Sequence, residues 1–98
     1  MLYSTFLLKD NIHLNVYVLR EYEDRDGGIN LAIRIEQEDH AENFSEWRLP
    51  DVACVKSFGF SESDTFKIED YLTTNEAIIW DDWREHKDAR TARYISWL

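Results

Sequence analysis

Two stretches of alternating residues decide the fold: residues 12–18 read IHLNVYV and residues 29–36 read INLAIRIE. In both, every second side chain is aliphatic, which is the period of a strand with one buried face. Residues 24–28 lie between them and read DRDGG, and their glycines accept the positive φ of a tight turn. The pattern therefore predicts a β-hairpin.

The remaining strands are expected on either side of this hairpin. The apolar stretch over 2–9 predicts a strand that turns back into the strand over 12–20, which the strand over 29–36 then follows. Residues 52–56, VACVK, are the candidate for a short fourth strand. An antiparallel sheet of this kind buries one face, so another layer must cover it.

The second half of the chain should supply that layer. The first helix is predicted over 62–73, because Ser61 can cap it, Asp64 sits at the return position of a capping box, and Phe60 can pack as a hydrophobic staple.

A second capping box, Thr73 with Glu76, predicts a break and a new helix over 76–97. The expected fold is α+β in one domain over 1–98. It consists of an antiparallel sheet of three or four strands from the N-terminal half, covered by two C-terminal helices.

Composition restricts the classes of partner. The 98 residues include 20 acids against 11 lysines and arginines, a net charge of -9. This charge repels nucleic acid and anionic membranes and favours a basic protein partner. The single Cys54 excludes a disulfide within the chain and is expected to be a small buried thiol. The N-terminus has no basic leader, so a soluble, cytoplasmic protein is expected.

An acidic segment over 36–46 is the first candidate site. It is predicted to be a loop, and it carries five acids and no base. The functional interpretation is an anionic docking surface with aromatic anchors, and the alternative is a solvated loop. The predicted partner-binding residues here are Glu36, Glu38, Asp39, Glu42, Phe44, Glu46 and Trp47.

The second candidate lies on the predicted last helix, where residues 75–86 read NEAIIWDDWREH. At 100° per residue, Ile79, Trp80 and Trp83 share one side of the helix and are expected to pack on the sheet. The acids fall toward the other side. Asp81, Asp82 and Glu85 are therefore the remaining predicted partner-binding residues.

Two other kinds of site stay open. Asp82 and His86 stand at i and i+4, the spacing of two metal ligands on a helix, with His13 or His40 as the third ligand. No nucleophile or phosphate-binding motif occurs, so the chain is not expected to be an enzyme, and no cofactor or metal is assigned.

The second of these open sites is an oligomer contact formed by the C-terminal tail. Tyr94, Trp97 and Leu98 share a helical stripe, which either folds back onto the domain or forms a homodimer.

One part of the chain resembles a group of short bacterial proteins of unknown function, over about 25 residues. The features that carry the resemblance are Gly59-Phe60-Ser61 at a helix start, Ile68, Asn75-Glu76, Ile79 and Trp83. That group has a His-x-His strand. Here His13 is in such a place, but Asn15 stands where the second histidine would be. The resemblance implies a small bacterial or phage accessory domain of toxin–antitoxin kind and supplies no activity.

The sequence as a whole favours a small acidic protein-binding module that inhibits or neutralises a partner with a basic surface. An antitoxin, an immunity protein and a phage-encoded inhibitor are members of this class. The alternatives are a small metal-binding or hydrolytic domain and a structural subunit of a homo-oligomer.

Overall fold

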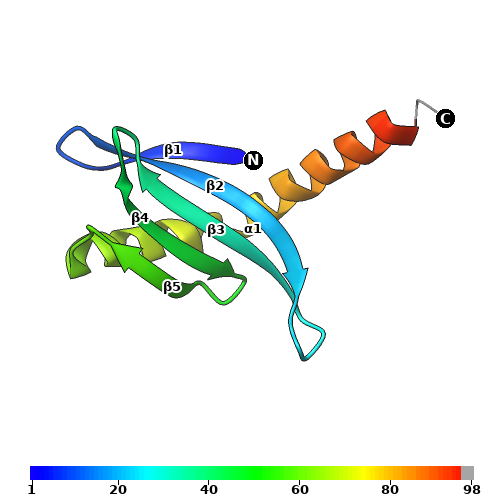
Figure 1. Cartoon of the computed structure of the whole chain (residues 1–98), viewed down its shortest axis with the longest axis horizontal. Coiled ribbons are helices and arrows are strands. Elements are labelled where there is room, and N and C mark those ends of the chain that lie inside the picture. Colours follow the sequence, from blue (N-terminus) through cyan, green and yellow to red (C-terminus); the bar gives the residue numbers. More distant parts are fainter. Residues whose placement is uncertain (96–98) are drawn as a thin grey trace.

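The structure, a computed structural model, describes residues 1–95 and the side chains of residues 1–88. The strands are β1 (Leu2–Lys9), β2 (Ile12–Glu23), β3 (Ile29–Gln37), β4 (His40–Leu49) and β5 (Ala53–Phe58), and they precede the helix α1 (Glu62–Ile95). Each strand pairs antiparallel with the next, so the sheet is a meander in the order β1-β2-β3-β4-β5. The helix crosses one face of the sheet, and its last turns extend past the sheet (Figure 1).

The architecture corrects the expected number of elements. The α+β class and the antiparallel sheet are confirmed, but the sheet has five strands, not three or four, and the described residues form one helix, not two. Strands over 2–9, 12–20 and 29–36 were predicted nearly where β1, β2 and β3 lie, and β5 falls close to the proposed strand over 52–56.

The strand β4 is the element that the sequence interpretation misses. Residues 36–46 were predicted to be a loop, but Gln37 pairs with His40 across a two-residue turn, and the chain continues as β4. Ser45, Trp47 and Leu49 alternate on the buried face of this strand. The acids that suggested a loop occupy the turn and the outward positions of a hairpin.

The helix α1 runs without a break through the position where a second helix was expected to begin. Thr73 does not cap a new helix, because its hydroxyl donates to the carbonyl of Glu69 at 2.9 Å inside the helix. The amide of Asn75 likewise donates to the carbonyl of Tyr71 at 2.8 Å. Both side chains bond to the preceding turn, so these residues are accommodated in a continuous helix.

The start of α1 follows the prediction. The backbone N–H of Asp64 donates to Oγ of Ser61 at 3.0 Å, and the N–H of Ser61 donates to Oδ2 of Asp64 at 3.1 Å. This reciprocal pair is a capping box. Gly59 precedes it with a φ of +79°, and a Cβ there would lie 2.1 Å from Oδ1 of Asn43. Only glycine therefore fits this connection between β5 and α1.

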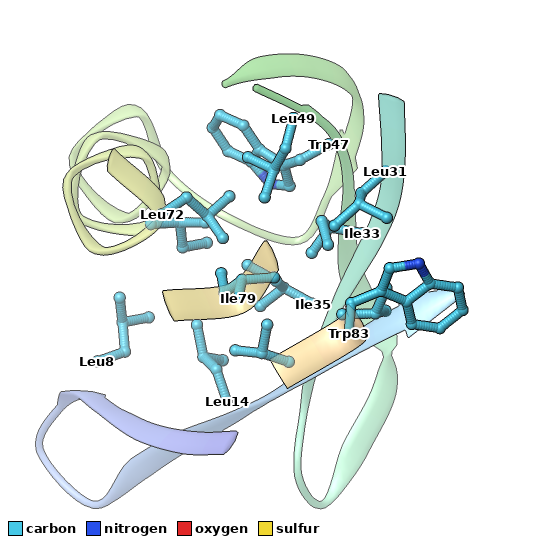
Figure 2. Close-up of a cluster of buried hydrophobic side chains, with 13 residues drawn as sticks. Leu8, Leu14, Leu31, Ile33, Ile35, Trp47, Leu49, Leu72, Ile79 and Trp83 are labelled. Atoms are coloured by element: carbon cyan, nitrogen blue, oxygen red, sulfur yellow. The ribbon is translucent and has the colours of Figure 1, made fainter. Parts of the chain in front are cut away.

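The core lies between the sheet and the first two thirds of α1 (Figure 2). It takes Leu8 of β1, the inward residues of β2, β3 and β4 and one stripe of the helix. The buried hydrophobic residues are Leu8, Leu14, Val16, Val18, Leu31, Ile33, Ile35, Trp47, Leu49, Ile68, Leu72, Ile79 and Trp83. The predicted alternation in both hairpin strands is thus confirmed, except that Ile29 at the start of β3 is exposed.

Three contacts fasten α1 to β1, the strand that its backbone approaches most closely. The Lys9 ammonium lies 2.8 Å from Oδ1 of the buried Asp64, the rings of Phe6 and Tyr71 stack at 3.9 Å, and the Tyr3 hydroxyl donates to Asn75 at 3.4 Å. These contacts follow one another along the helix. The helix is therefore attached to β1 at three successive points.

Candidate docking surfaces

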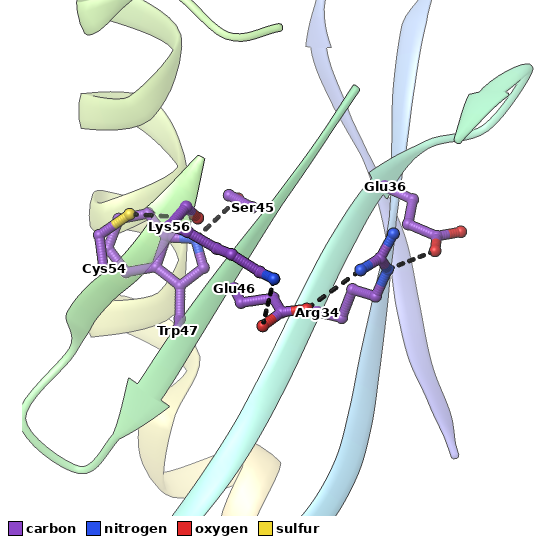
Figure 3. A network of polar contacts seen from close by, with 7 residues as sticks. All are labelled: Arg34, Glu36, Ser45, Glu46, Trp47, Cys54 and Lys56. Carbon is purple, nitrogen blue, oxygen red and sulfur yellow. Dashed lines mark hydrogen bonds and ion pairs between the residues drawn. The ribbon is translucent and has the colours of Figure 1, made fainter. Parts of the chain in front are cut away.

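The acidic segment over 36–46 divides between two environments. Glu36 and Glu46 project from the sheet face that the helix leaves open, and both contact Arg34, at 2.6 and 3.1 Å. Lys56 lies 3.9 Å from the second carboxylate (Figure 3). The charges of these two acids are thus largely compensated within the sheet. The hydrogen bond with Glu36 and its charge raise the pKa of Arg34.

The other acids of the segment lie at the tip of the hairpin. Glu38 and Asp39 form the turn and are exposed, and Glu42 contacts the ring of His40 at 3.2 Å. All three carboxylates reach solvent. An exposed pair such as the last contributes little to stability, since water and salt screen it.

The two aromatic anchors predicted for this segment have different positions. Trp47 is a correction: it is 2% exposed, and its indole N–H donates to Oγ of the buried Ser45 at 2.8 Å, so it cannot contact a partner. It points inward because its position pairs with Ile33 on the core face. Phe44 lies on the open face, half-buried, with the guanidinium of Arg34 at 3.8 Å from its ring centre and Phe58 at 5.2 Å.

The acids predicted on the helix face solvent as expected. Asp81, Asp82 and Glu85 are exposed, and the first of them contacts Arg84 at 3.4 Å in an exposed pair. The sequence interpretation named only these three helix acids as partner-binding residues. Further acids on α1 are exposed as well: Glu62, Glu69, Asp70 and Asp88. Helical periodicity carried over the whole of 62–88 would have found them.

The helix acids and the hairpin acids lie at opposite ends of β2. The N–H of Glu38 donates to the carbonyl of His13 at 2.9 Å near the start of the strand, whereas Trp83 bonds to Glu21 near its end. Eight residues of strand separate His13 from Glu21, which corresponds to about 26 Å. The predicted partner-binding residues therefore form two surfaces, not one.

A hollow of about 580 Å³ adjoins the helix acids. It lies between the end of the sheet and α1, and Ile29, Trp80, Asp81 and Arg84 contribute to its lining. The guanidinium of Arg84 lies 5.5 Å from the ring centre of Trp80. Trp80 was predicted to be a core anchor like Trp83, but it is only partly buried and offers an aromatic surface beside exposed charge.

A second hollow, of about 420 Å³, lies between β5 and the first turns of α1. The residues that line it are Ser57, Phe60, Glu62, Thr65, Phe66 and Glu69. Cys54 on the same strand is a further correction, because it is exposed and not the buried thiol that was expected. Partial burial of its sulfur and the charge of Glu69 nevertheless raise the pKa of the thiol.

The metal-site alternative finds no third ligand among the described residues. Asp82 and His86 are on α1, and the ring of His86 stacks on Trp83 at 5.7 Å. His13 and His40 belong to the far end of the sheet, and no group of three potential ligands occurs in the described part of the chain.

The tail residues that suggested a homodimer lie beyond the side chains that the structure describes. Trp97 and Leu98 lie outside the described residues, and Tyr94 is described only in its backbone. Within the described part, no helix is both long and apolar enough to cross a membrane.

Comparison with known proteins gives no relative. No protein family, no curated protein and no solved structure matches the chain.

Proposed function

We propose that this chain is a small acidic protein-binding module that inhibits or neutralises a partner with a basic surface, as an antitoxin, an immunity protein or a phage-encoded inhibitor does. The observation that carries the proposal is the charge on the outer surface of α1. Between Glu62 and Asp88 the chain has nine acids and three bases. Apart from the buried Asp64 and the half-buried Glu76, these acids are exposed.

The charge on α1 is also less compensated than the charge of the sheet acids Glu36 and Glu46. The sheet acids Glu36 and Glu46 have cations beside them, whereas among the α1 acids only Asp64 and Asp81 form an ion pair with a described side chain. Uncompensated charge on one surface attracts an oppositely charged partner over a Debye length of about 10 Å and speeds association. The helix carries more exposed acids without an ion pair than the hairpin tip does, so it is the better docking surface of the two.

An aromatic side chain completes this surface. Protein interfaces gain most of their affinity from a few aromatic or arginine anchors surrounded by polar residues. Trp80 and Arg84 supply such a pair next to Asp81, in the hollow at the end of the sheet. A partner whose basic site normally holds phosphates would meet carboxylates in their place, so binding would block that site.

The proposal is tested with two variants that remove equal charge from the two surfaces. Asp81→Asn, Asp82→Asn and Glu85→Gln neutralise the helix. Glu38→Gln, Asp39→Asn and Glu42→Gln neutralise the hairpin tip. Each tagged variant is incubated with lysate of the source organism at low salt and eluted with rising salt, and the captured proteins are identified by mass spectrometry.

The expected result is one basic protein that binds the wild type and the hairpin variant but is lost from the helix variant. Loss from both variants to the same extent would mean that net charge alone attracts the partner. Loss from the hairpin variant alone would move the site to the β3–β4 turn. Binding that does not change with salt would overturn the electrostatic mechanism.

A further inference from the structure

We propose that the groove between β5 and the start of α1 binds an extended basic segment of the partner protein as a sixth strand of the sheet. The proposal rests on the proposed function, since it assumes a basic protein partner, and it specifies how that partner is held. It starts from the edge of the sheet. β5 is last in the strand order, so no described residue pairs with its outer edge.

An unpaired edge offers a row of backbone N–H and C=O groups to another chain. Native sheets usually protect such edges with charged residues, proline or bulges. In β5 only Lys56 is charged, and it points to the open face, where it approaches Glu46. The register against β4 shifts at Val55, which marks a bulge there, and residues 56–58 pair regularly beyond it. The strand therefore remains able to accept a neighbour, which is the mode of recognition called β-augmentation.

The side chains around this edge are unusually apolar for a surface. Phe66 on α1 is 70% exposed and Val55 on β5 is 63% exposed, more than the other large hydrophobic side chains described. Phe58, at 55%, is on the same strand but lies on the open face, where it packs against Phe44. Exposed apolar groups gathered along one edge are typical of a surface that a partner covers.

The hollow beside β5 gives the added strand somewhere to place its side chains. Every second residue of such a strand would point toward α1, into the hollow that Phe60 and Phe66 line.

Charge selects the chemistry of the occupant. Glu62 and Glu69 line the hollow, and no lysine or arginine does. The segment should therefore present an apolar and a basic residue two positions apart, one against Phe66 and one against a glutamate. A second copy of this chain is a poorer occupant, because its net charge of -9 would bring acids to acids.

The opposite edge of the sheet provides the comparison. β1 also ends the sheet, and a hollow of about 310 Å³ lies between it and α1. There, however, Phe6 and Tyr71 stack, and Lys67 and Asp70 balance each other in charge along the lining. Leu7 on this edge is 60% exposed, which makes it a matched control for Phe66.

The test uses a displayed library of random twelve-residue peptides, selected on the immobilised full chain. Selected peptides should carry Lys or Arg two positions from a large apolar residue. A consensus peptide, measured by fluorescence anisotropy, should lose at least tenfold in affinity for Phe66→Ser and for Glu62→Gln with Glu69→Gln. Affinity for Leu7→Ser should stay within twofold. Circular dichroism verifies that each variant is folded.

Backbone pairing is tested on the peptide itself. In an added strand, every second N–H group points toward β5 and the others point to solvent. N-methylation of the first set of residues should abolish binding, whereas N-methylation of the other set should leave the affinity within threefold. Equal losses of affinity for the two sets of methylated peptides would overturn strand addition. So would greater sensitivity to Leu7→Ser, the absence of any selected peptide, or a dimer in solution that Phe66→Ser dissociates.

The two proposals fail separately. If partner capture depends on Asp81, Asp82 and Glu85 but is unchanged by Phe66→Ser, the module binds through the helix and the groove proposal is wrong. If the peptide results hold but no basic protein is captured, the groove binds a strand and the proposed function is wrong.

Discussion

The indole N–H of Trp83 donates a hydrogen bond of 2.9 Å to Oε1 of Glu21, 62 residues earlier in the chain. The ammonium of Lys87 lies 2.9 Å from the same oxygen. One carboxylate on β2 thus holds two consecutive turns of α1, at the point where the helix leaves the sheet. This is the end of the helix opposite to its attachment to β1.

Replacing this carboxylate should loosen the helix. Glu21→Ala is expected to lower the free energy of unfolding by about 1–2 kcal/mol, at the lower end for bonds to a charged group because the side chain is 29% exposed. Glu21→Gln keeps an acceptor for Trp83 and should cost about half as much. Urea unfolding followed by circular dichroism measures both. Glu23→Ala, an exposed neighbour on β2, is the control, and an equal effect there would contradict the assignment.

Stability should also fall in acid. Hydrogen bonds from Lys87 and Trp83 lower the pKa of Glu21. Burial alone would raise the pKa of Asp64, but the bonds from Lys9 and Ser61 lower it overall. A carboxyl whose pKa is lower in the folded state stabilises the fold above its unfolded pKa of about 4, and this stabilisation is lost as the pH falls through the folded pKa.

The free energy of unfolding is therefore expected to decline as the pH drops below about 5. The double variant Glu21→Gln with Asp64→Asn should be less stable at pH 7 and should decline less steeply. Urea unfolding at several pH values between 2 and 7 measures the slope. Parallel curves for wild type and variant would show that other carboxylates control the acid response.

The buried pair of Ser45 and Trp47 predicts non-additive mutations. Ser45→Ala leaves the indole N–H of Trp47 without its acceptor in a dry site, which should cost about 1–3 kcal/mol. Trp47→Phe removes the donor but leaves a cavity. The double variant should therefore lose less stability than the two single losses added together, by about 1 kcal/mol. Urea unfolding measures the three free-energy losses, and strict additivity of the two single losses in the double variant would contradict the hydrogen bond.

Because α1 is continuous, the loss of stability on replacing Ser61 at its start should differ from that on replacing Thr73 in its interior. Ser61→Ala removes the capping hydroxyl and should cost about 1 kcal/mol. Thr73→Ala lies inside the helix and should stay within about 0.5 kcal/mol of the wild type, since alanine is the better helix former. If Thr73→Ala were as costly as Ser61→Ala, a second helix start at that residue would be supported.

Removal of residues 89–98 should leave the fold stable. The last turns of α1 extend past the sheet (Figure 1), so the free energy of unfolding should change by less than about 0.5 kcal/mol. Light scattering on the full and shortened chains also tests the homo-oligomer alternative. A change from dimer to monomer on truncation would favour it over the proposed protein-binding module.

β2 and β3 were predictable because their aliphatic residues alternate, and β1 because the stretch over 2–9 is largely apolar. β4 was not, because Ser45 and Trp47 replace aliphatic residues on its inner face and the five acids between residues 36 and 46 are typical of a solvated loop. The single helix was not predictable for a related reason. Thr73 and Asn75 are weak helix formers, but Leu72 and Ile79 on either side are fully buried, and this packing keeps the helix intact.

The candidate site was predictable only in part. Helical spacing put Asp81, Asp82 and Glu85 on the solvent side without knowledge of the fold. The groove at β5 was not foreseen, since it depends on which strand ends the sheet. Strand order follows from pairing across the whole chain, and a local pattern around Val55 or Phe66 does not contain it.

The meander has a consequence for how the chain folds. Each strand pairs with the one made just before it, so the sheet forms from hairpins with small loop-closure entropy, which favours rapid folding. Docking of α1 on β1 and β2 must instead close loops of about sixty residues, so it is expected to follow the rate-limiting step. In stopped-flow measurements, substitutions in the β2–β3 hairpin should then slow folding, whereas Glu21→Ala should mainly accelerate unfolding.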